Sequence, residues 1–197
     1  MTPKQEERIK NKIVKIKKAL AADKKMWGGY HHDGQGLRYA PPKYFIQLGD
    51  FSGGLRYLNW FNKNFPDDFG FPNFLFEWTI ILFKTGRKKE AQRKAFETFT
   101  RNTYLFDKFF GREIIKIVKY EMSNLEVPEF AIEHFNYSKN QEDLSDFAEW
   151  LKEITQSEKF LNLMNRFIEI QIQLENENDS KSRKDLIKKS SELENEL

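Results

Sequence analysis

The sequence has no cysteine among its 197 residues. This absence excludes a disulfide framework, a thiolate metal site and a cysteine nucleophile. No apolar run reaches the roughly 18 residues that a membrane-spanning helix needs, and the opening MTPKQEERIKNK lacks the apolar core of a secretion signal. We therefore expect a cytoplasmic protein that does not insert into a membrane.

Motifs for catalysis are also missing. The chain has neither the phosphate-binding pattern G-x-x-x-x-G-K-[ST] nor G-x-S-x-G, and its three histidines form no H-x-x-x-H pair. The one cluster suited to catalysis or metal binding is His31-His32-Asp33. In an extended loop, alternation would put His31 and Asp33 on one side and His32 on the other. We predict a protein that is not an enzyme and has no metal site and no cofactor; an enzyme built on this loop is an alternative.

The formal net charge of +3 conceals an asymmetry along the chain. Residues 1–25 hold nine Lys or Arg against three Asp or Glu, so this segment carries +6 and the remainder −3. Ile9, Ile13, Ile16 and Leu20 recur at steps of three and four, which predicts a helix over residues 3–26 with one narrow apolar face. The lysines then face water. Nucleic-acid binding by this basic helix is the alternative function.

Turn signals divide the next part of the chain into short helices. Residues 27–42 are rich in glycine and irregular, and Pro41-Pro42 can open a helix that ends at Leu48. Gly49 can adopt the left-handed backbone that ends a helix, and Asp50 can accept hydrogen bonds from the first amides of the next one. Pro66 stops that second helix.

The stretch GDFSGGLRYLNWFNKNFP, residues 49–66, resembles the second half of a tetratricopeptide repeat. The positions that carry the resemblance are Gly49, Phe51, Gly54, Leu58, Phe61 and Pro66. A second unit follows with Leu75, Trp78, Leu82, Gly86, Ala91 and Ala95. Gly49 and Gly86, which precede the second helix of each unit, are 37 residues apart, against about 34 in the ordinary repeat. Residues 69–71 are the natural place for the inserted residues.

Two short segments widen this resemblance to residues 33–111. The segment 33–39, DGQGLRY, looks like the D-N-Q-G-x-R-Y lead-in of a group of tetratricopeptide-like proteins, with Gly34 in place of the asparagine. Residues 102–104, NTY, resemble the N-x-Y segment that follows the repeats in that group. The resemblance implies a helical-repeat fold and a binding function, and it implies no known reaction.

We therefore predict an all-α fold, a right-handed stack of antiparallel helix pairs with flanking capping helices. The single domain spans 1–176, with the repeats at 42–104 and capping helices at 105–176; residues 177–197 form a polar helix or a tail. Within 105–176 we expect helices at 105–110, 112–123 and 128–136. We expect a fourth helix that Asn140 caps at its start, and a fifth that begins after Ser157. The thirteen aromatic residues between Tyr44 and Phe83 are expected to form core.

The predicted function is a non-catalytic scaffold that binds a protein or peptide partner. In a stack of this kind the first helix of each pair lines a concave groove, which suits an extended peptide or a partner helix. The predicted partner-binding residues are Arg38, Tyr39, Lys43, Gln47, Asn73, Phe76, Glu77 and Lys84. For Arg38 two roles stay open, because its guanidinium could order the glycine-rich loop or pair with a partner carboxylate. The alternative to an open groove is that capping helices fill it.

Overall fold

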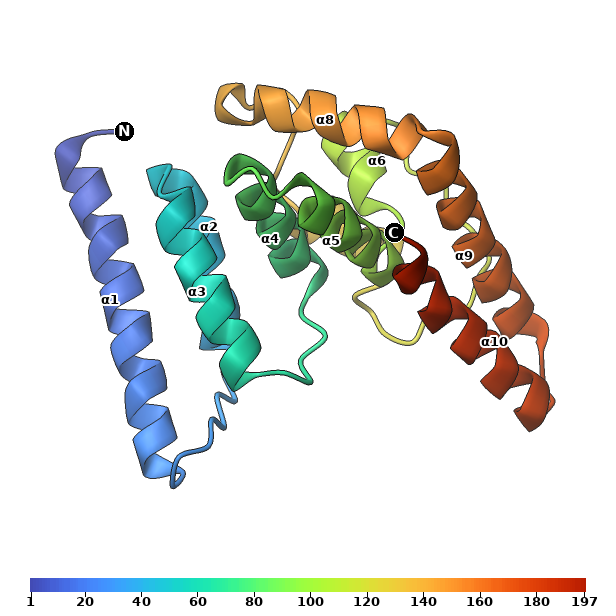
Figure 1. The fold of residues 1–197 in the computed structure, drawn as a ribbon, viewed down its shortest axis with the longest axis horizontal. Helices are drawn as coiled ribbons and strands as arrows, with labels where there is room; N and C mark the ends of the chain where they lie inside the picture. The colour runs from blue at the N-terminus through green and yellow to red at the C-terminus, as the bar shows by residue number, and fades with distance from the viewer. The chain divides into compact units, whose positions relative to one another are not determined.

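A computed structural model describes all residues, 1–197, and is helical throughout (Figure 1). It contains ten α-helices and three short 3-10 helices, and no strand. The chain forms two compact units, residues 1–88 (unit 1) and 89–197 (unit 2). The boundary between the units falls inside the second predicted repeat. No helix combines the length and the apolar character that crossing a membrane requires.

Unit 1 holds four α-helices whose ends follow the local signals in the sequence. They are α1 (Pro3–Met26), α2 (Pro41–Leu48), α3 (Phe51–Asn64) and α4 (Pro72–Lys84), with the 3-10 helix η1 (Leu37–Tyr39) before α2. The predicted helix over 3–26 is confirmed. Thr2 and Gln5 cap it reciprocally, each side chain bonding the other's backbone N–H, which satisfies two amides that a helix start leaves open.

The turn between α2 and α3 also has the predicted chemistry. Gly49 has φ +66°, in the left-handed region, where a side chain would be strained. The Asp50 carboxylate accepts a hydrogen bond of 2.8 Å from the Gly53 N–H at the start of α3. Gly86, at the corresponding position after α4, has φ +77°. Both predicted turns are therefore confirmed.

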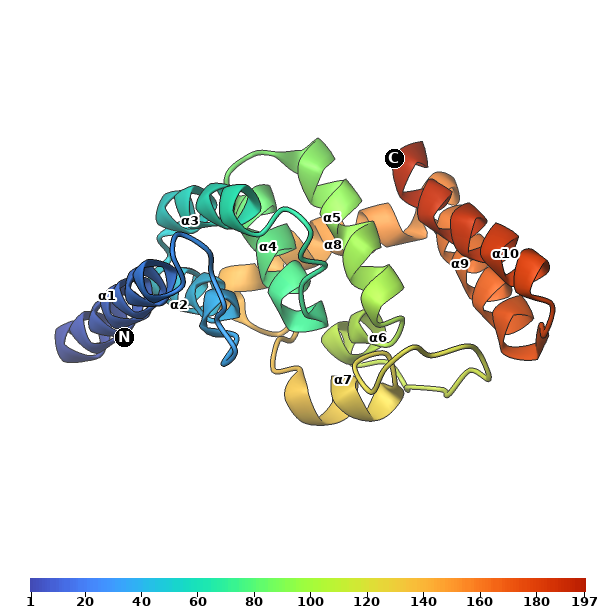
Figure 2. The same ribbon diagram turned by 90° about the horizontal axis from the view of Figure 1, so that it is seen from below.

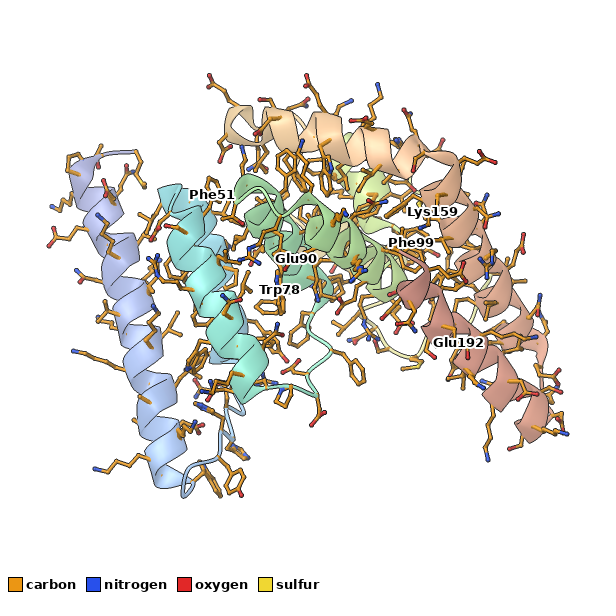
Figure 3. The ribbon with its side chains drawn as sticks, viewed as in Figure 1. Phe51, Trp78, Glu90, Phe99, Lys159 and Glu192 are labelled. Atoms are coloured by element: carbon orange, nitrogen blue, oxygen red, sulfur yellow. The ribbon has the colours of Figure 1, made fainter.

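The core of unit 1 is aromatic. Helix α2 contacts α1, α3 and α4, and Figure 1 shows α1, α2 and α3 side by side. Ile13 of α1 packs with Phe45 of α2 and Tyr57 of α3. One turn further along the same face of α3, the Phe61 ring lies 5.8 Å from that of Trp78, which projects from α4 in Figure 3. Aromatic rings therefore join α2 to α3 and α3 to α4.

Gly54 is the point of closest approach among α2, α3 and α4. A Cβ atom added there would lie 2.9 Å from Ile81 Cδ1 and 3.2 Å from Phe45 Cβ. The first atom belongs to a flexible side-chain end, but the second is attached directly to the α2 backbone. The small residue at this position therefore permits the three helices to approach one another.

Gly54→Val is expected to lower the free energy of unfolding by about 2 kcal/mol, because overpacking a dense core displaces its neighbours. Urea denaturation followed by circular dichroism measures this change. Asn59→Val is the matched control, since Asn59 is an exposed residue of the same helix, and should change stability by less than about 0.5 kcal/mol. Equal effects of the two substitutions would contradict the close packing at Gly54.

Unit 2 is built from six α-helices and two irregular connections (Figure 2). Its α-helices are α5 (Lys88–Arg101), α6 (Leu105–Phe110), α7 (Pro128–His134), α8 (Ser145–Gln156), α9 (Glu158–Asn176) and α10 (Ser180–Glu192), with the 3-10 helices η2 (Glu142–Leu144) and η3 (Leu193–Glu196). The Phe99 ring of α5, labelled in Figure 3, lies 5.9 Å from the Phe167 ring of α9. Helices α9 and α10 lie side by side. Residues 177–197, predicted to form a polar helix or a tail, are largely helical because α10 and η3 cover most of them.

The predicted helix over 112–123 is wrong. Residues 112–121 have no regular secondary structure, although their apolar residues recur at helical spacing. Four β-branched residues, Ile114, Ile115, Ile117 and Val118, lower the helix propensity of this stretch. Hydrogen bonds to distant residues hold it instead: the Ile117 N–H donates to the Tyr104 hydroxyl at 3.1 Å, and the Tyr120 N–H donates to the Gln171 carbonyl at 3.0 Å.

The predicted cap at Asn140 is also wrong. Helix α8 begins at Ser145, after η2, and its N-cap residue, Leu144, forms no side-chain capping hydrogen bond. The extra 3-10 turn moves the helix start away from Asn140. The other predicted starts agree with the structure: α7 begins at Pro128, and Ser157 caps α9 by accepting a hydrogen bond from the Phe160 N–H.

Candidate functional site

Arg38 connects the two loops of unit 1. Its Nη1 donates to Asp33 Oδ2 at 3.0 Å, and its Nε donates to Asp68 Oδ2 at 2.6 Å. Its Nη2 donates to the Tyr39 hydroxyl at 2.8 Å, and that hydroxyl lies 2.7 Å from both Asp68 carboxylate oxygens. Residues 27–40 and residues 65–71, called here the paired loops, are therefore joined by a charge-assisted network.

Asp33 organises the first of the paired loops around this network. Its side chain is only 2% exposed, and its two oxygens accept hydrogen bonds from the Leu37 and Arg38 N–H groups at 2.9 and 3.0 Å. Its own backbone has φ +37°, a conformation that costs energy for a residue with a side chain. The hydrogen bonds compensate for this strain and start η1.

The ionisation of this network suits its structural role. Burial by itself would raise the pKa of Asp68, but hydrogen bonds from Tyr39, the Gly70 N–H and Arg38 outweigh it, and the pKa is lowered. Burial and the nearby Asp68 raise the pKa of the Tyr39 hydroxyl, so this group stays protonated and can donate. Of the two roles considered for Arg38, its contacts match loop ordering.

The other predicted partner-binding residues lie in different environments. Lys43 and Gln47 are exposed on α2, and Asn73 and Lys84 are half-buried on α4. The Lys84 ammonium lies 5.7 Å from the centre of the Phe51 ring. Tyr39 is half-buried and packs against Phe71.

The expectation that Phe76 and Glu77 line an open groove is wrong. Phe76 has no exposed surface and Glu77 is buried. Helix α4 is apolar on nearly every side, and nine of its residues besides Glu77 are buried. A helix that is apolar all round belongs in a core. The nearly continuous apolar run NFLFEWTIILF indicated a buried helix, but the resemblance to a repeat led us to expect that one side of this helix faces a groove.

The histidine cluster has the predicted alternation of sides. The His31 and Asp33 side chains are buried, whereas His32 is exposed and its ring stacks on Trp27 at 4.8 Å. The acidic group nearest to His31 is that of Asp23, 3.7 Å from Nδ1. Asp33 is occupied by η1 and Arg38. No group of three or more His, Cys, Asp or Glu side chains is arranged to hold a metal ion.

The paired loops present large aromatic side chains to solvent. Tyr30 is 80% exposed and Phe69 is 71% exposed, and Trp27 and Phe71 are partly exposed. Sequence reasoning assigned Phe69 and Phe71 to the core and missed all four as surface residues. A signal was present, because each lies beside a glycine in WGGY or FGF, and such stretches form turns at the surface.

Comparisons with family models, curated proteins and solved structures found no match for this chain.

Proposed function

We propose that this protein is a non-catalytic interaction module that binds an acidic protein segment at the paired loops of unit 1. The observation that carries this proposal is the combination of exposed aromatic side chains, including Trp27 and Tyr30, with a loop framework held by Arg38. Aromatic residues dominate the binding energy of many protein interfaces. A framework ordered before binding loses less conformational entropy when the partner arrives.

The net charge of unit 1 as a whole, which is carried by residues outside the paired loops, indicates the kind of partner. Unit 1 contains 16 Lys or Arg against 8 Asp or Glu, for a net charge of +8. An acidic segment with apolar side chains would be attracted by this charge and would bury the exposed rings. The buried Phe76 removes one aromatic anchor from the proposed groove, which favours the paired loops as the docking surface.

We further propose that α2 and α3 form a tetratricopeptide-like unit and that α4 begins a second one. The helix bounds, the left-handed Gly49 and Gly86 and the close packing at Gly54 support this assignment. Each helix of such a repeat buries its apolar face against its neighbours. A binding function without a reaction is what this class implies.

A capture experiment from native lysate tests the proposal. Immobilised wild-type protein is compared with a Trp27→Ser, Tyr30→Ser double variant and with a Leu161→Ser, Ile187→Ser control, whose residues are exposed apolar residues of unit 2. An acidic protein should be retained by wild type and control, and at least about tenfold less by the loop variant, as for the loss of hot-spot residues. Circular dichroism checks that all three proteins fold.

Equal capture by the loop variant would contradict the proposal. Retention of nucleic acid alone, released by high salt, would contradict it as well, and would favour binding through the lysines of α1. The exposed lysines of that helix include Lys4, Lys15, Lys18 and Lys25, none of which forms an ion pair.

A further inference from the structure

A pocket of about 430 Å³ lies between α1, α3 and the residue His31 of the first paired loop. Its volume falls within the range of roughly 300–1,000 Å³ found for small-molecule sites. The residues that give it chemical character are Lys17, Lys24, His31, Arg56, Tyr57 and Trp60. All of them belong to unit 1, and only His31 was named from the sequence, in the alternative of an enzyme built on its loop.

The pocket is lined by three cations and no carboxylate. The Lys24 ammonium donates to Asn64 Oδ1 at 2.8 Å, and the Lys17 ammonium lies 5.3 Å from the centre of the Phe45 ring. Arg56 is exposed and forms neither an ion pair nor a hydrogen bond. Three cationic residues with no acidic residue among the lining side chains give the pocket a positive potential. This arrangement favours a negatively charged ligand.

His31 provides an independent indication that a ligand binds here. Its side chain is only 4% exposed, and both ring nitrogens are buried without a hydrogen-bond partner. The Asp23 carboxylate oxygen lies 3.7 Å from Nδ1, which is too far for a hydrogen bond. A buried polar group left unsatisfied costs about 1–3 kcal/mol. A polar ligand atom that reached one of these nitrogens would remove that cost, because imidazole can both donate and accept.

The remaining wall of the pocket is aromatic. The Tyr57 and Trp60 rings have centroids 5.2 Å apart, and the His31 ring meets Trp60 edge-on at 5.6 Å. The Tyr57 hydroxyl donates to the Arg38 carbonyl at 2.7 Å, and burial raises its pKa, so this residue brings no negative charge. The wall therefore suits a flat apolar group.

We propose that this pocket binds a small aromatic anion, a planar ring that carries a carboxylate or a phosphate. The ring packs against Trp60 and Tyr57, the anionic group pairs with Arg56 and the neighbouring lysines, and a polar ring atom meets His31. Arginine is well suited to both anions because its planar fork matches carboxylate and phosphate oxygens. This site does not depend on the partner proposed for the paired loops.

Isothermal titration calorimetry on the full chain tests the proposal with two pairs of probes. Indole-3-acetate and indole-3-acetamide differ in the charge of a carboxyl group; adenosine 5′-monophosphate and adenosine differ in a phosphate. At least one anion should bind at a single site about tenfold or more tighter than its neutral counterpart, as expected for a hydrogen-bonded ion pair. Which anion binds shows whether the ligand carries a carboxylate or a phosphate.

Three variants connect the binding to the pocket. Arg56→Gln should weaken the anion about tenfold, and Arg8→Gln, at an exposed position of α1, should leave it unchanged. His31→Phe should also weaken binding without lowering the melting temperature, because it removes buried nitrogens that have no partner. The Trp27→Ser, Tyr30→Ser variant should bind the anion normally, which separates this test from that of the paired loops.

The proposal is overturned if none of the four probes binds saturably, or if anion and neutral counterpart bind equally. It is also overturned if Arg56→Gln and Arg8→Gln have the same affinity as wild type.

Discussion

Arg38→Ala is expected to lower the free energy of unfolding by about 3 kcal/mol, the low end of the range for removing one partner of a buried ion pair. The reason lies in what remains after the substitution. Asp33, with a side chain only 2% exposed, and the half-buried Asp68 would both keep a negative charge without their cation. The Tyr39 hydroxyl would lose one donor as well. Urea denaturation followed by circular dichroism measures the change.

Arg112→Ala is the matched control for this prediction. Arg112 pairs with Asp107 at 3.4 Å, but both side chains are well exposed, so the pair should contribute less than about 1 kcal/mol. Arg38→Lys should fall between wild type and Arg38→Ala, because lysine keeps the charge and loses the planar fork. If Arg38→Ala lowers the free energy of unfolding no more than Arg112→Ala does, the network does not hold the paired loops. That result would also contradict the ordered framework of the proposed interface.

Asn102→Ala is expected to lower the free energy of unfolding by about 3 kcal/mol, at about 1 kcal/mol for each of three hydrogen bonds. The buried Asn102 amide donates to the Leu125 and Val127 carbonyls at 2.7 and 3.0 Å. Its oxygen accepts from the Tyr104 N–H at 3.0 Å. The substitution leaves three backbone groups without their partner. Hydrogen exchange should also become faster across residues 112–127.

Asn124→Ala provides the comparison, because Asn124 is exposed in the same irregular segment and its side chain forms no hydrogen bond. Its stability should stay within about 0.5 kcal/mol of wild type. Asn102→Asp offers a further check: the carboxylate keeps the acceptor for Tyr104 but cannot donate to the two carbonyls. A stability of Asn102→Ala equal to that of Asn124→Ala would show that other contacts hold the segment.

The helix boundaries of unit 1 were readable from the sequence because their causes are local. Apolar residues at steps of three and four predicted α1, and Gly49 with Asp50 predicted the turn between α2 and α3. A left-handed glycine and a capping carboxylate act on residues two to four positions away. Neighbours in the chain supply the whole interaction, so the sequence is sufficient.

The segment 112–127 was not readable in this way. Its apolar spacing fits a helix, but its conformation is held by Asn102, Tyr104 and Gln171, which lie up to about fifty positions away. A weak local preference yields to hydrogen bonds from distant residues. The sequence contained the partners, and nothing in their spacing indicated which segment they would bind.

The candidate sites show the same division. The sequence pointed to Arg38 and Tyr39 and to the loop that contains them, because glycine-rich segments need an anchor to hold one shape. It could not show that Asp68 completes the network, that Phe76 is buried, or that His31 faces a pocket with Arg56. Burial and charge clustering depend on which residues distant in the chain come together in space, and only the tertiary structure decides that.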